Sequence, residues 1–167
     1  KSTGASLKFN LLNRDARIWP IVAGGGASIL YFDTIAKEFG KESLGFYGEY
    51  SGGPSTDLMY KYSKIILNLV LTSKAKNKIL LLGGANANFT YIPDTFKGII
   101  KAMDEVKKDI VKQKIFVVVR RAGPHDTEGL EMMTTFLTES KIPNQVFGIE
   151  TNITDTFKKI SKNYAKK

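Results

Sequence analysis

The sequence of 167 residues contains no cysteine and a single histidine, His125. Without cysteine, disulfides, thiolate zinc sites and a cysteine nucleophile are excluded, and a reducing cytoplasm is the expected location. No apolar run approaches the roughly 20 residues of a membrane-spanning helix, so we expect a soluble chain without membrane contact. The first residues, KSTGASLKF, lack both an initiator methionine and the apolar stretch of a signal peptide. Lys1 is therefore expected to mark a cut within a longer chain.

Positive charge is in excess, with a formal net charge of +9, which raises nucleic acid as a possible partner. The lysines are scattered over the expected helix faces and gather only at Lys107–Lys108, Lys158–Lys159 and the C-terminal tail. No motif of interleaved basic and aromatic residues, of the kind that stacks on RNA bases, is present. A solvated lysine-rich surface explains this charge better than nucleic-acid binding does.

Apolar, β-rich runs alternate with helical patterns along the chain. The runs at 79–82 and 117–119 are continuous, which is typical of parallel strands covered on both faces. Alternating strands and helices within one domain predict a doubly wound α/β fold with a mostly parallel sheet of five strands. The expected strands are Ile18–Ala23, Gly45–Tyr50, Lys78–Leu82, Ile115–Arg120 and Gln145–Ile149.

Several residues punctuate this pattern. Gly40 is expected to end the first helix, and Ser55 and Asp94 are candidate helix caps. Pro20 is awkward in a central strand and is expected at a strand start or a bulge. Residues 1–17 do not fit the alternation; SLKFNLL followed by NRD predicts a short lead-in hairpin that belongs to whatever precedes the domain.

Each expected strand runs into a loop rich in glycine or in polar residues. In open parallel sheets, ligands bind beyond the carboxyl ends of the strands, where glycine turns and helix N-termini present N–H groups to anions. AGGGAS at 23–28 matches neither a Walker loop nor a dinucleotide fingerprint, and tight turns alone could explain such glycines. Arg120 and Arg121 end one strand, and neighbours on a strand point to opposite faces, so one of them can reach the crevice. A plain pair of surface arginines is the alternative.

The expected crevice contains little that could do chemistry by itself. His125 is the only histidine, and no cluster of His, Asp and Glu has metal-ligand spacing, so no metal site is expected. No nucleophile is visibly paired with a base. The residues alone therefore predict a domain that holds an anion without transforming it.

The loops, in their order, resemble the citrate-binding domain that follows the ATP-grasp region of ATP-citrate lyase. The resemblance is carried by GASLKFNLLNRDARIW, VAGGGAS, YGEYSGGPS, KILLLGGANANFT, FKGII, VVRRAGP, EGL and IPNQVFGIET, which together cover nearly the whole chain. The large subunit of citryl-CoA synthetase has the same pattern, and the β subunit of succinyl-CoA synthetase has a weaker version. The resemblance implies a flavodoxin-like three-layer αβα domain at 18–167, with 1–17 as the end of the ATP-grasp region.

The same resemblance implies how citrate is held. The citrate-binding residues would be Ser51, Gly52, Asn88, Phe89, Thr90 and Arg121, supported by the glycines Gly24, Gly25, Gly26, Gly83 and Gly84. No catalytic residue is implied within this chain, because the phosphohistidine of the family would lie on a partner segment and His125 does not match it. The full enzyme would use ATP, Mg²⁺ and CoA in a cytoplasmic hetero-oligomer with the CoA-binding subunit, whereas this domain alone would bind no cofactor.

Some alternatives stay open at this stage. A succinyl-CoA synthetase-type β domain and a non-catalytic anion-binding module are the rival hypotheses, and the residues do not separate a lyase parent from a synthetase parent. The animal enzyme has a tyrosine that helps hold citrate at the position of Val106, so that contact is expected to be lost here. The resemblance is looser after EGL.

Overall fold

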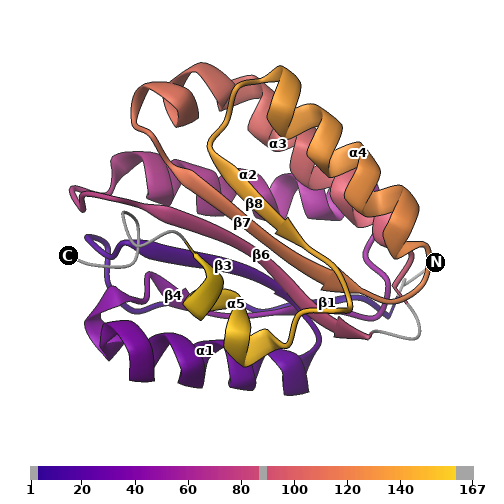
Figure 1. Ribbon diagram of the computed structural model, residues 1–167, viewed down its shortest axis with the longest axis horizontal. Coiled ribbons are helices and arrows are strands. Elements are labelled where there is room, and N and C mark those ends of the chain that lie inside the picture. Colours follow the sequence, from indigo (N-terminus) through magenta and orange to yellow (C-terminus); the bar gives the residue numbers. More distant parts are fainter. Residues whose placement is uncertain (1–3, 87–89, 161–167) are drawn as a thin grey trace.

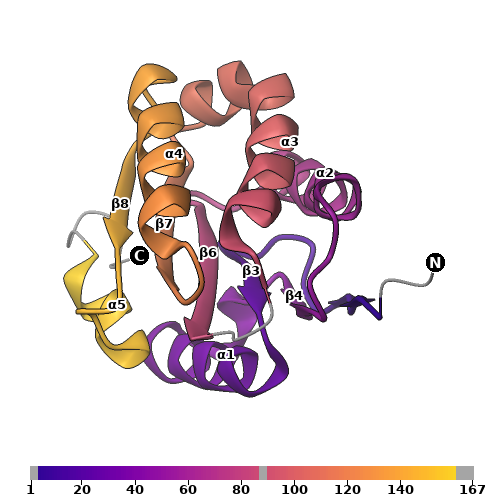
Figure 2. The same ribbon diagram turned by 90° about the vertical axis from the view of Figure 1, so that its right-hand side faces the viewer.

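The computed structural model describes residues 4–86 and 90–160, and its helices lie in two layers on either side of one sheet (Figure 1). Helices α1 and α5 cover one face, and α2, α3 and α4 cover the other (Figures 1 and 2). The helices are α1 Gly25–Phe39, α2 Thr56–Thr72, α3 Ile92–Lys112, α4 Asp126–Glu139 and α5 Ile153–Lys159, with a 3-10 turn at Lys41–Ser43. The strands are β1 Ser6–Leu7, β2 Asn10–Leu11, β3 Ile18–Ala23, β4 Phe46–Tyr47, β5 Tyr50–Ser51, β6 Ile79–Asn86, β7 Phe116–Ala122 and β8 Asn144–Phe147.

The main sheet has the strand order β1-β5-β3-β6-β7-β8, and β2 and β4 form a separate pair. All neighbours from β5 to β8 are parallel, and only β1 runs antiparallel. Numbered along the chain, the parallel strands therefore lie in the flavodoxin order 2-1-3-4-5. This order confirms the expected fold class, and it places the reversal of strand order between β3 and β6, where ligands bind in such folds.

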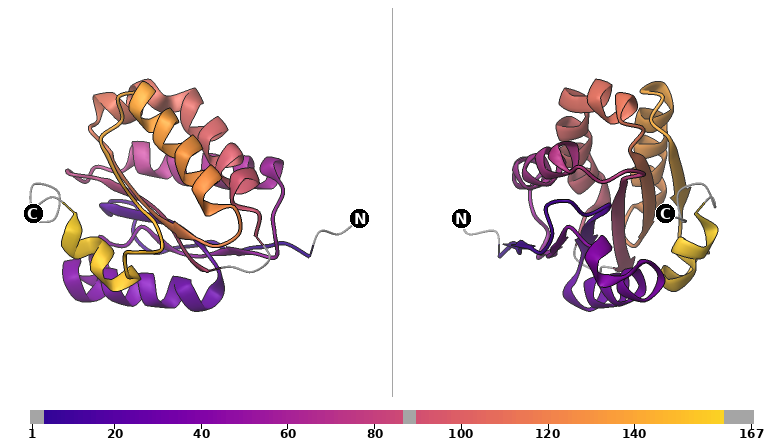
Figure 3. Two further views of the ribbon diagram at one scale, coloured as in Figure 1. Left: turned by 45° about the vertical axis from the view of Figure 1, so that its right-hand side comes forward. Right: turned by 90° about the vertical axis from the view of Figure 1, so that its left-hand side faces the viewer.

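Two expectations about the sheet are wrong. The main sheet has six strands rather than five, because the lead-in strand β1 pairs with β5 at its edge. The lead-in segment is also not a hairpin, since β1 pairs with β5 and β2 pairs with β4 instead of with each other. The predicted strand at 45–50 is correspondingly divided into β4 and β5. Figures 2 and 3 show the indigo lead-in strand on the side of β4, away from β8.

Pro20 lies inside β3, opposite Leu81 of β6. Even-numbered residues in and just after β3 direct their backbone groups toward the segment that contains β4 and β5. The Ile18 carbonyl accepts from the Gly45 N–H, and the Gly24 N–H donates to the Tyr50 carbonyl. Between these two contacts, β4 pairs with β2 instead of with β3. Among the described residues, no strand is therefore hydrogen-bonded to Pro20 on that side. The missing N–H of proline therefore costs no hydrogen bond there.

The helix ends follow local chemistry with one exception. Gly40 follows α1 with a φ of 84°, as predicted, and Ser55 caps α2 by accepting from the Leu58 N–H at 3.3 Å. Asp94 is not a cap, because α3 begins two residues earlier and Tyr91 holds the cap position without a side-chain bond. Asp94 instead lies in the first turn, where its negative charge is favourable.

Two apolar clusters, one on each face of the sheet, form the core. Alternate residues of the strands supply them: Trp19, Leu80 and Val117 face α2, α3 and α4, whereas Ile18, Ile79 and Val118 face α1 and α5. Within the described parts of the chain, no helix is long and apolar enough to cross a membrane.

Candidate functional site

The carboxyl ends of the central strands bring several predicted loops together. The register pairs Ala23 with Gly84 across β3 and β6, and Gly83 with Arg120 across β6 and β7. On the other side, Ala23 pairs with Tyr50, so the Ser51 loop lies at the same edge. The AGGG, YSG, GGAN and RRA segments therefore meet at the point where the strand order reverses.

Of the predicted NFT stretch, only Thr90 falls within the described part of the chain; Asn88 and Phe89 lie outside it. Thr90 is buried, directly before the first turn of α3. The Ile92 N–H donates to the Pro124 carbonyl at 3.4 Å, which ties the start of α3 to the loop after β7. This bond brings the start of α3, which follows Thr90 in the chain, to the loop after the strand that carries Arg121.

Arg121 is completely buried, and its guanidinium is only partly satisfied. Its Nη1 donates to the carbonyls of Ala85 at 2.6 Å and Ala122 at 2.9 Å. Its Nε and Nη2 are buried and have no hydrogen-bond partner in the described parts of the chain. A buried donor left unpaired costs free energy, and a charged one costs more, so an acceptor at this position would stabilise the site.

Gly84 lies directly against this arginine. A Cβ at Gly84 would lie 2.7 Å from Nη1 of Arg121 and 3.1 Å from the Cβ of Ala23. Gly83, another of the five predicted supporting glycines, lies against a different side chain, because a Cβ there would be 2.9 Å from the ring of Tyr31. Both glycines allow side chains to lie against the end of β6.

Arg120 points to the opposite face, as the alternation along a strand predicts. It is also buried, and its Nε donates to the Thr151 carbonyl while its Nη1 donates to the Gly84 carbonyl, both at 2.8 Å. Thr151 precedes α5, so this arginine lies on the face of α1 and α5. The alternative of two surface arginines is wrong for this chain.

The Ser51–Gly52 loop is held by the lead-in strand. Ser51 pairs with Ser6, and Gly52 has a φ of 72°, which favours glycine. A Cβ at Gly52 would lie 2.5 Å from the Gly4 carbonyl oxygen. The backbone of the lead-in segment therefore shapes the loop that was predicted to hold citrate.

The start of α1 is occupied by a carboxylate of the protein itself. Glu49 is buried, its Oε1 accepts from Lys8 at 2.8 Å, and its Oε2 lies 3.3 Å from the position a Cβ of Gly25 would take. The first turn of α1 contains no acidic residue, so Glu49 supplies the negative charge that a helix N-terminus favours. The supporting role of Gly24, Gly25 and Gly26 stays a prediction. Neither Glu49 nor Lys8 was predicted from the sequence.

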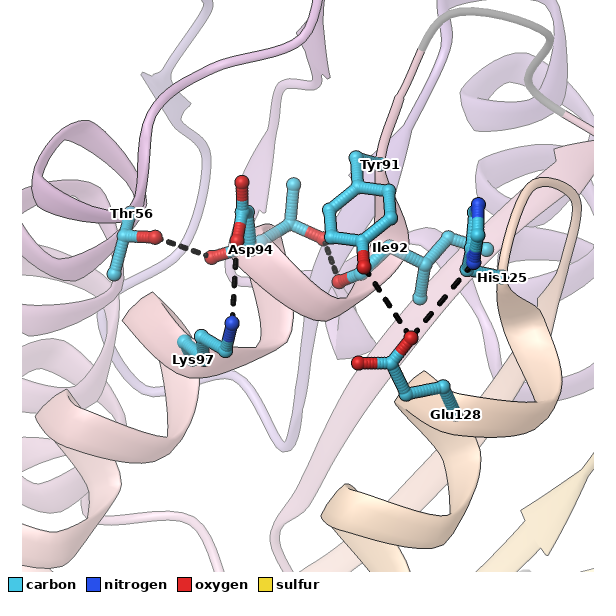
Figure 4. A network of polar contacts seen from close by, with 8 residues as sticks. Thr56, Tyr91, Ile92, Asp94, Lys97, His125 and Glu128 are labelled. Atoms are coloured by element: carbon cyan, nitrogen blue, oxygen red, sulfur yellow. Dashed lines mark hydrogen bonds and ion pairs between the residues drawn. The ribbon is translucent and has the colours of Figure 1, made fainter.

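A polar network joins the helices around the site (Figure 4). The Tyr91 hydroxyl donates to Oε2 of Glu128 at 3.2 Å, and Nδ1 of His125 lies 3.7 Å from the same oxygen. Thr56 of α2 donates to the Asp94 carbonyl at 3.0 Å. The first turns of α2, α3 and α4 are therefore connected to one another. His125 belongs to this network and lies directly before α4 in a left-handed conformation with a φ of 58°.

Tyr31 of α1 is a further residue that sequence reasoning missed. Its buried hydroxyl lies 3.3 Å from the Arg120 carbonyl and 3.5 Å from the Gly84 carbonyl, and it accepts from the Gly84 N–H at 3.3 Å. Burial raises the pKa of Tyr31 to about 12, so the hydroxyl stays protonated at neutral pH. It lies where the register between β6 and β7 shifts, between Gly83 and Asn86. No local pattern separates this tyrosine from an ordinary core aromatic.

Tyr31→Phe is expected to lower the free energy of unfolding by about 1–2 kcal/mol, because buried backbone groups at the strand ends lose their partner. Urea denaturation followed by circular dichroism measures this change. Tyr47→Phe is the matched control, since the Tyr47 side chain is exposed. Equal effects of the two changes would mean that the Tyr31 hydroxyl does not hold the strand ends.

The structure also describes the surroundings of Val106 and the acidic and histidine side chains that could bind a metal. Val106 packs against the core in the second half of α3, about 21 Å along the helix from its start at 1.5 Å per residue. Among the described residues, no group of three or more His, Asp or Glu side chains could hold a metal ion.

Comparison with known proteins gives one consistent result. The family described as "ATP citrate lyase citrate-binding" matches residues 1–162. The chain is 46% identical over 153 residues to the ATP-citrate synthase of Mus musculus, covering 91% of this chain and 14% of that protein. It is 40% identical to the probable ATP-citrate synthase subunit 2 of Schizosaccharomyces pombe, covering 90% of this chain and 31% of that protein. The chain thus spans less than a third of each of these two relatives.

Solved structures agree with this assignment. The ATP citrate lyase of Methanothrix soehngenii, in complex with citrate and coenzyme A, superposes with a TM-score of 0.87 at 45% identity, covering 90% of this chain and 40% of that one. The D541A mutant of Methanosaeta concilii ATP citrate lyase, in complex with (3S)-citryl-CoA, gives the same TM-score and identity and is covered over 38% of its length. From the family match, the identities and these superpositions, we conclude that this chain belongs to the ATP citrate lyase citrate-binding family.

Proposed function

We propose that this chain is the domain that binds citrate in an ATP-dependent citrate-activating enzyme. The observation that supports this most is the buried guanidinium of Arg121, whose Nε and Nη2 have no partner in the described parts of the chain. A guanidinium can bind a carboxylate through two parallel N–H···O bonds. The Ser51 loop and Thr90 flank the same edge and offer further donors.

Citrate is favoured as the guest by the similarity to solved enzymes that contain it. Ser51, Gly52, Asn88, Phe89, Thr90 and Arg121 are the residues that we propose to contact it. Their role would be to hold one carboxylate ready for attack on a phosphoryl group, so the domain contributes by positioning a reactant. Alone, it should bind citrate without turning it over.

The chemistry of the whole enzyme is part of this proposal. A histidine on a partner segment would carry the phosphoryl group derived from ATP, citrate would accept it to form citryl phosphate, and CoA would displace phosphate to give citryl-CoA. A lyase module would then cleave citryl-CoA to acetyl-CoA and oxaloacetate. ATP, Mg²⁺ and CoA would be bound by other parts of a cytoplasmic hetero-oligomer, which would include an ATP-grasp region before residue 18 and a CoA-binding subunit.

Calorimetry on the isolated chain tests the proposal. We expect citrate to bind roughly tenfold or more tightly than succinate, because an additional carboxylate and hydroxyl meet donors that succinate leaves unpaired. Equal affinities would favour a succinyl-CoA synthetase-type domain. Binding of neither acid would favour a different anion.

Titration with duplex DNA tests whether the excess positive charge serves to bind nucleic acid. If the positive charge is only a solvated surface, DNA should bind weakly and lose nearly all affinity by about 0.2 M salt, because such binding rests on counterion release. Tight binding that resists salt would contradict the assignment to a citrate-binding enzyme.

A further inference from the structure

Arg120 lines a surface hollow on the face of the sheet opposite Arg121. The hollow has a volume of about 440 Å³ and lies at the carboxyl edge between the end of β6, α1 and the start of α5. We call it the Arg120 hollow. It is lined by Leu30, Ala85, Asn86, Arg120, Asn152, Ile153 and Thr154.

The charge of Arg120 has no counter-ion among the residues that the structure describes. Its buried side chain donates to two neutral carbonyls, those of Thr151 and Gly84, and also interacts with the neutral hydroxyl of Tyr31. Across residues 4–86 and 90–160, no carboxylate lies within ion-pair distance of it. Burying a charge without a counter-ion is unfavourable, so an anion in the hollow would stabilise the site.

The acidic residues nearest in the chain are engaged elsewhere. Glu150 accepts from the Gly148 N–H at 2.9 Å and from the Thr151 hydroxyl at 3.1 Å. Asp155 pairs with Lys158 at 2.9 Å. Within the described part of the chain, no carboxylate therefore neutralises Arg120, in contrast to the start of α1, where Glu49 supplies the negative charge.

The remaining polar lining suits an oxyanion. Asn86 presents an amide and Thr154 presents a hydroxyl, and both residues are exposed at the rim of the hollow, whereas the Asn152 amide bonds to the carboxylate of Asp155. A citrate carboxylate on Arg121 would lie on the other face, because neighbouring residues of a strand point to opposite sides. An anion in the hollow would therefore be separate from the one on Arg121.

We propose that the Arg120 hollow is a second oxyanion subsite, which takes a phosphate group. The choice of phosphate rests on the proposed function, since the other anions of that reaction are phosphates, either free or carried on CoA. Guanidinium, amide and hydroxyl donors together match the oxygens of a phosphate group. The subsite is separate from the one that holds citrate.

Titration of inorganic phosphate, followed by backbone amide NMR shifts at constant ionic strength, tests this. We expect the shifts to centre on Ala85, Asn86 and Ile153–Thr154 and to persist when citrate is saturating. A parallel titration with CoA distinguishes the source: tighter binding at the same amides means that the phosphate group is carried on CoA, and equal or weaker binding means that it is free phosphate. No shifts at these amides with either ligand, or displacement of phosphate by citrate in competition for one site, would overturn the proposal.

Two variants locate the subsite. Arg120→Met should weaken phosphate binding by roughly tenfold or more, because a charge-assisted bond is lost. Thr154→Glu keeps both Arg120 bonds and adds a carboxylate at the rim, so it should abolish phosphate binding even if Arg120→Met does not fold. Its matched control is Thr127→Glu, which makes the same change at an exposed position in the first turn of α4.

The outcomes separate this inference from the proposed function. Thr154→Glu should leave citrate affinity within a few-fold of that of the unchanged chain, whereas phosphate affinity is lost. Equal phosphate binding by Thr154→Glu and Thr127→Glu would refute the subsite. If the unchanged chain binds phosphate at the hollow and does not bind citrate, the proposed function fails and the subsite stands.

Discussion

Arg121→Ala is expected to weaken citrate binding by about 30- to 1000-fold. The Nε and Nη2 donors of this arginine are buried and have no partner among residues 4–86 and 90–160, so a citrate carboxylate is the acceptor that we assign to them. Removing the guanidinium loses a charge-assisted pair and leaves the carboxylate poorly compensated, at a cost of roughly 2–4 kcal/mol. Calorimetric titration of citrate measures the change, after circular dichroism has shown that the variant is folded.

Arg121→Lys should recover little of this affinity. A lysine ammonium is a point charge and cannot reproduce the planar fork that binds both oxygens of a carboxylate. The shorter reach of its donors would also leave the Ala85 carbonyl without the 2.6 Å bond that Nη1 now makes. A lysine variant with wild-type affinity would show that charge alone, rather than the fork, holds citrate.

Arg120→Ala is the matched control for the Arg121 variants. It removes the same side chain one residue earlier, from the opposite face, and should reduce stability more than citrate affinity, because the Gly84 and Thr151 carbonyls lose buried bonds. If Arg120→Ala loses citrate while Arg121→Ala keeps it, the two faces have been assigned in reverse. If neither variant weakens binding by more than a few-fold, citrate binds elsewhere.

Gly98→Ala is expected to lower the free energy of unfolding by about 1–3 kcal/mol. Gly98 lies where α3 crosses α2, and a Cβ there would be 2.4 Å from the Thr56 carbonyl oxygen and 2.7 Å from the Cβ of Met59. Backbone and Cβ atoms cannot rotate away, so the two helices must separate. For a chain of this size the melting temperature should fall by about 2–4 °C for each kcal/mol.

Gly26→Ala is the control for this second prediction. Gly26 also lies in a helix, α1, but no atom of the described residues is within 4 Å of the position its Cβ would take. The same substitution should therefore stabilise the protein by about 0.5–1 kcal/mol through helix propensity and a less flexible unfolded chain. Denaturant unfolding of both variants is decisive: if Gly98→Ala is as stable as Gly26→Ala, the contact between α2 and α3 is looser than the structure has it.

The strand and helix alternation, with its continuous apolar runs at 79–82 and 117–119, predicted the doubly wound sheet correctly. Such patterns are local, because burial on both faces of a parallel strand requires apolar residues at every position. Caps are local as well, so Ser55 was assigned from its neighbours alone. Asp94 failed as a cap because tertiary contacts extend α3 to Ile92, where the start of the helix is tied to Pro124 rather than capped by a side chain.

The lead-in segment could not be placed from its own residues. SLKFNLL followed by NRD is compatible with a hairpin, yet its strands pair with β5 and β4, which lie about 40 residues away. Strand pairing at that separation depends on which edge is left open once the sheet has formed. The five-stranded sheet expected from the alternation becomes six-stranded for this reason.

The sequence by itself determined the fold class, the edge at which the loops meet and the alternation that sends Arg120 and Arg121 to opposite faces, because all three follow from periodicity along one chain. Only the tertiary structure decided which charges have partners. Glu49 meets Lys8 and the start of α1, Arg120 is surrounded by neutral groups, and Arg121 keeps two buried donors without a partner among the described residues. Pairing and burial depend on groups that are distant in sequence and converge only when the sheet and its helices are packed, so no local pattern encodes them.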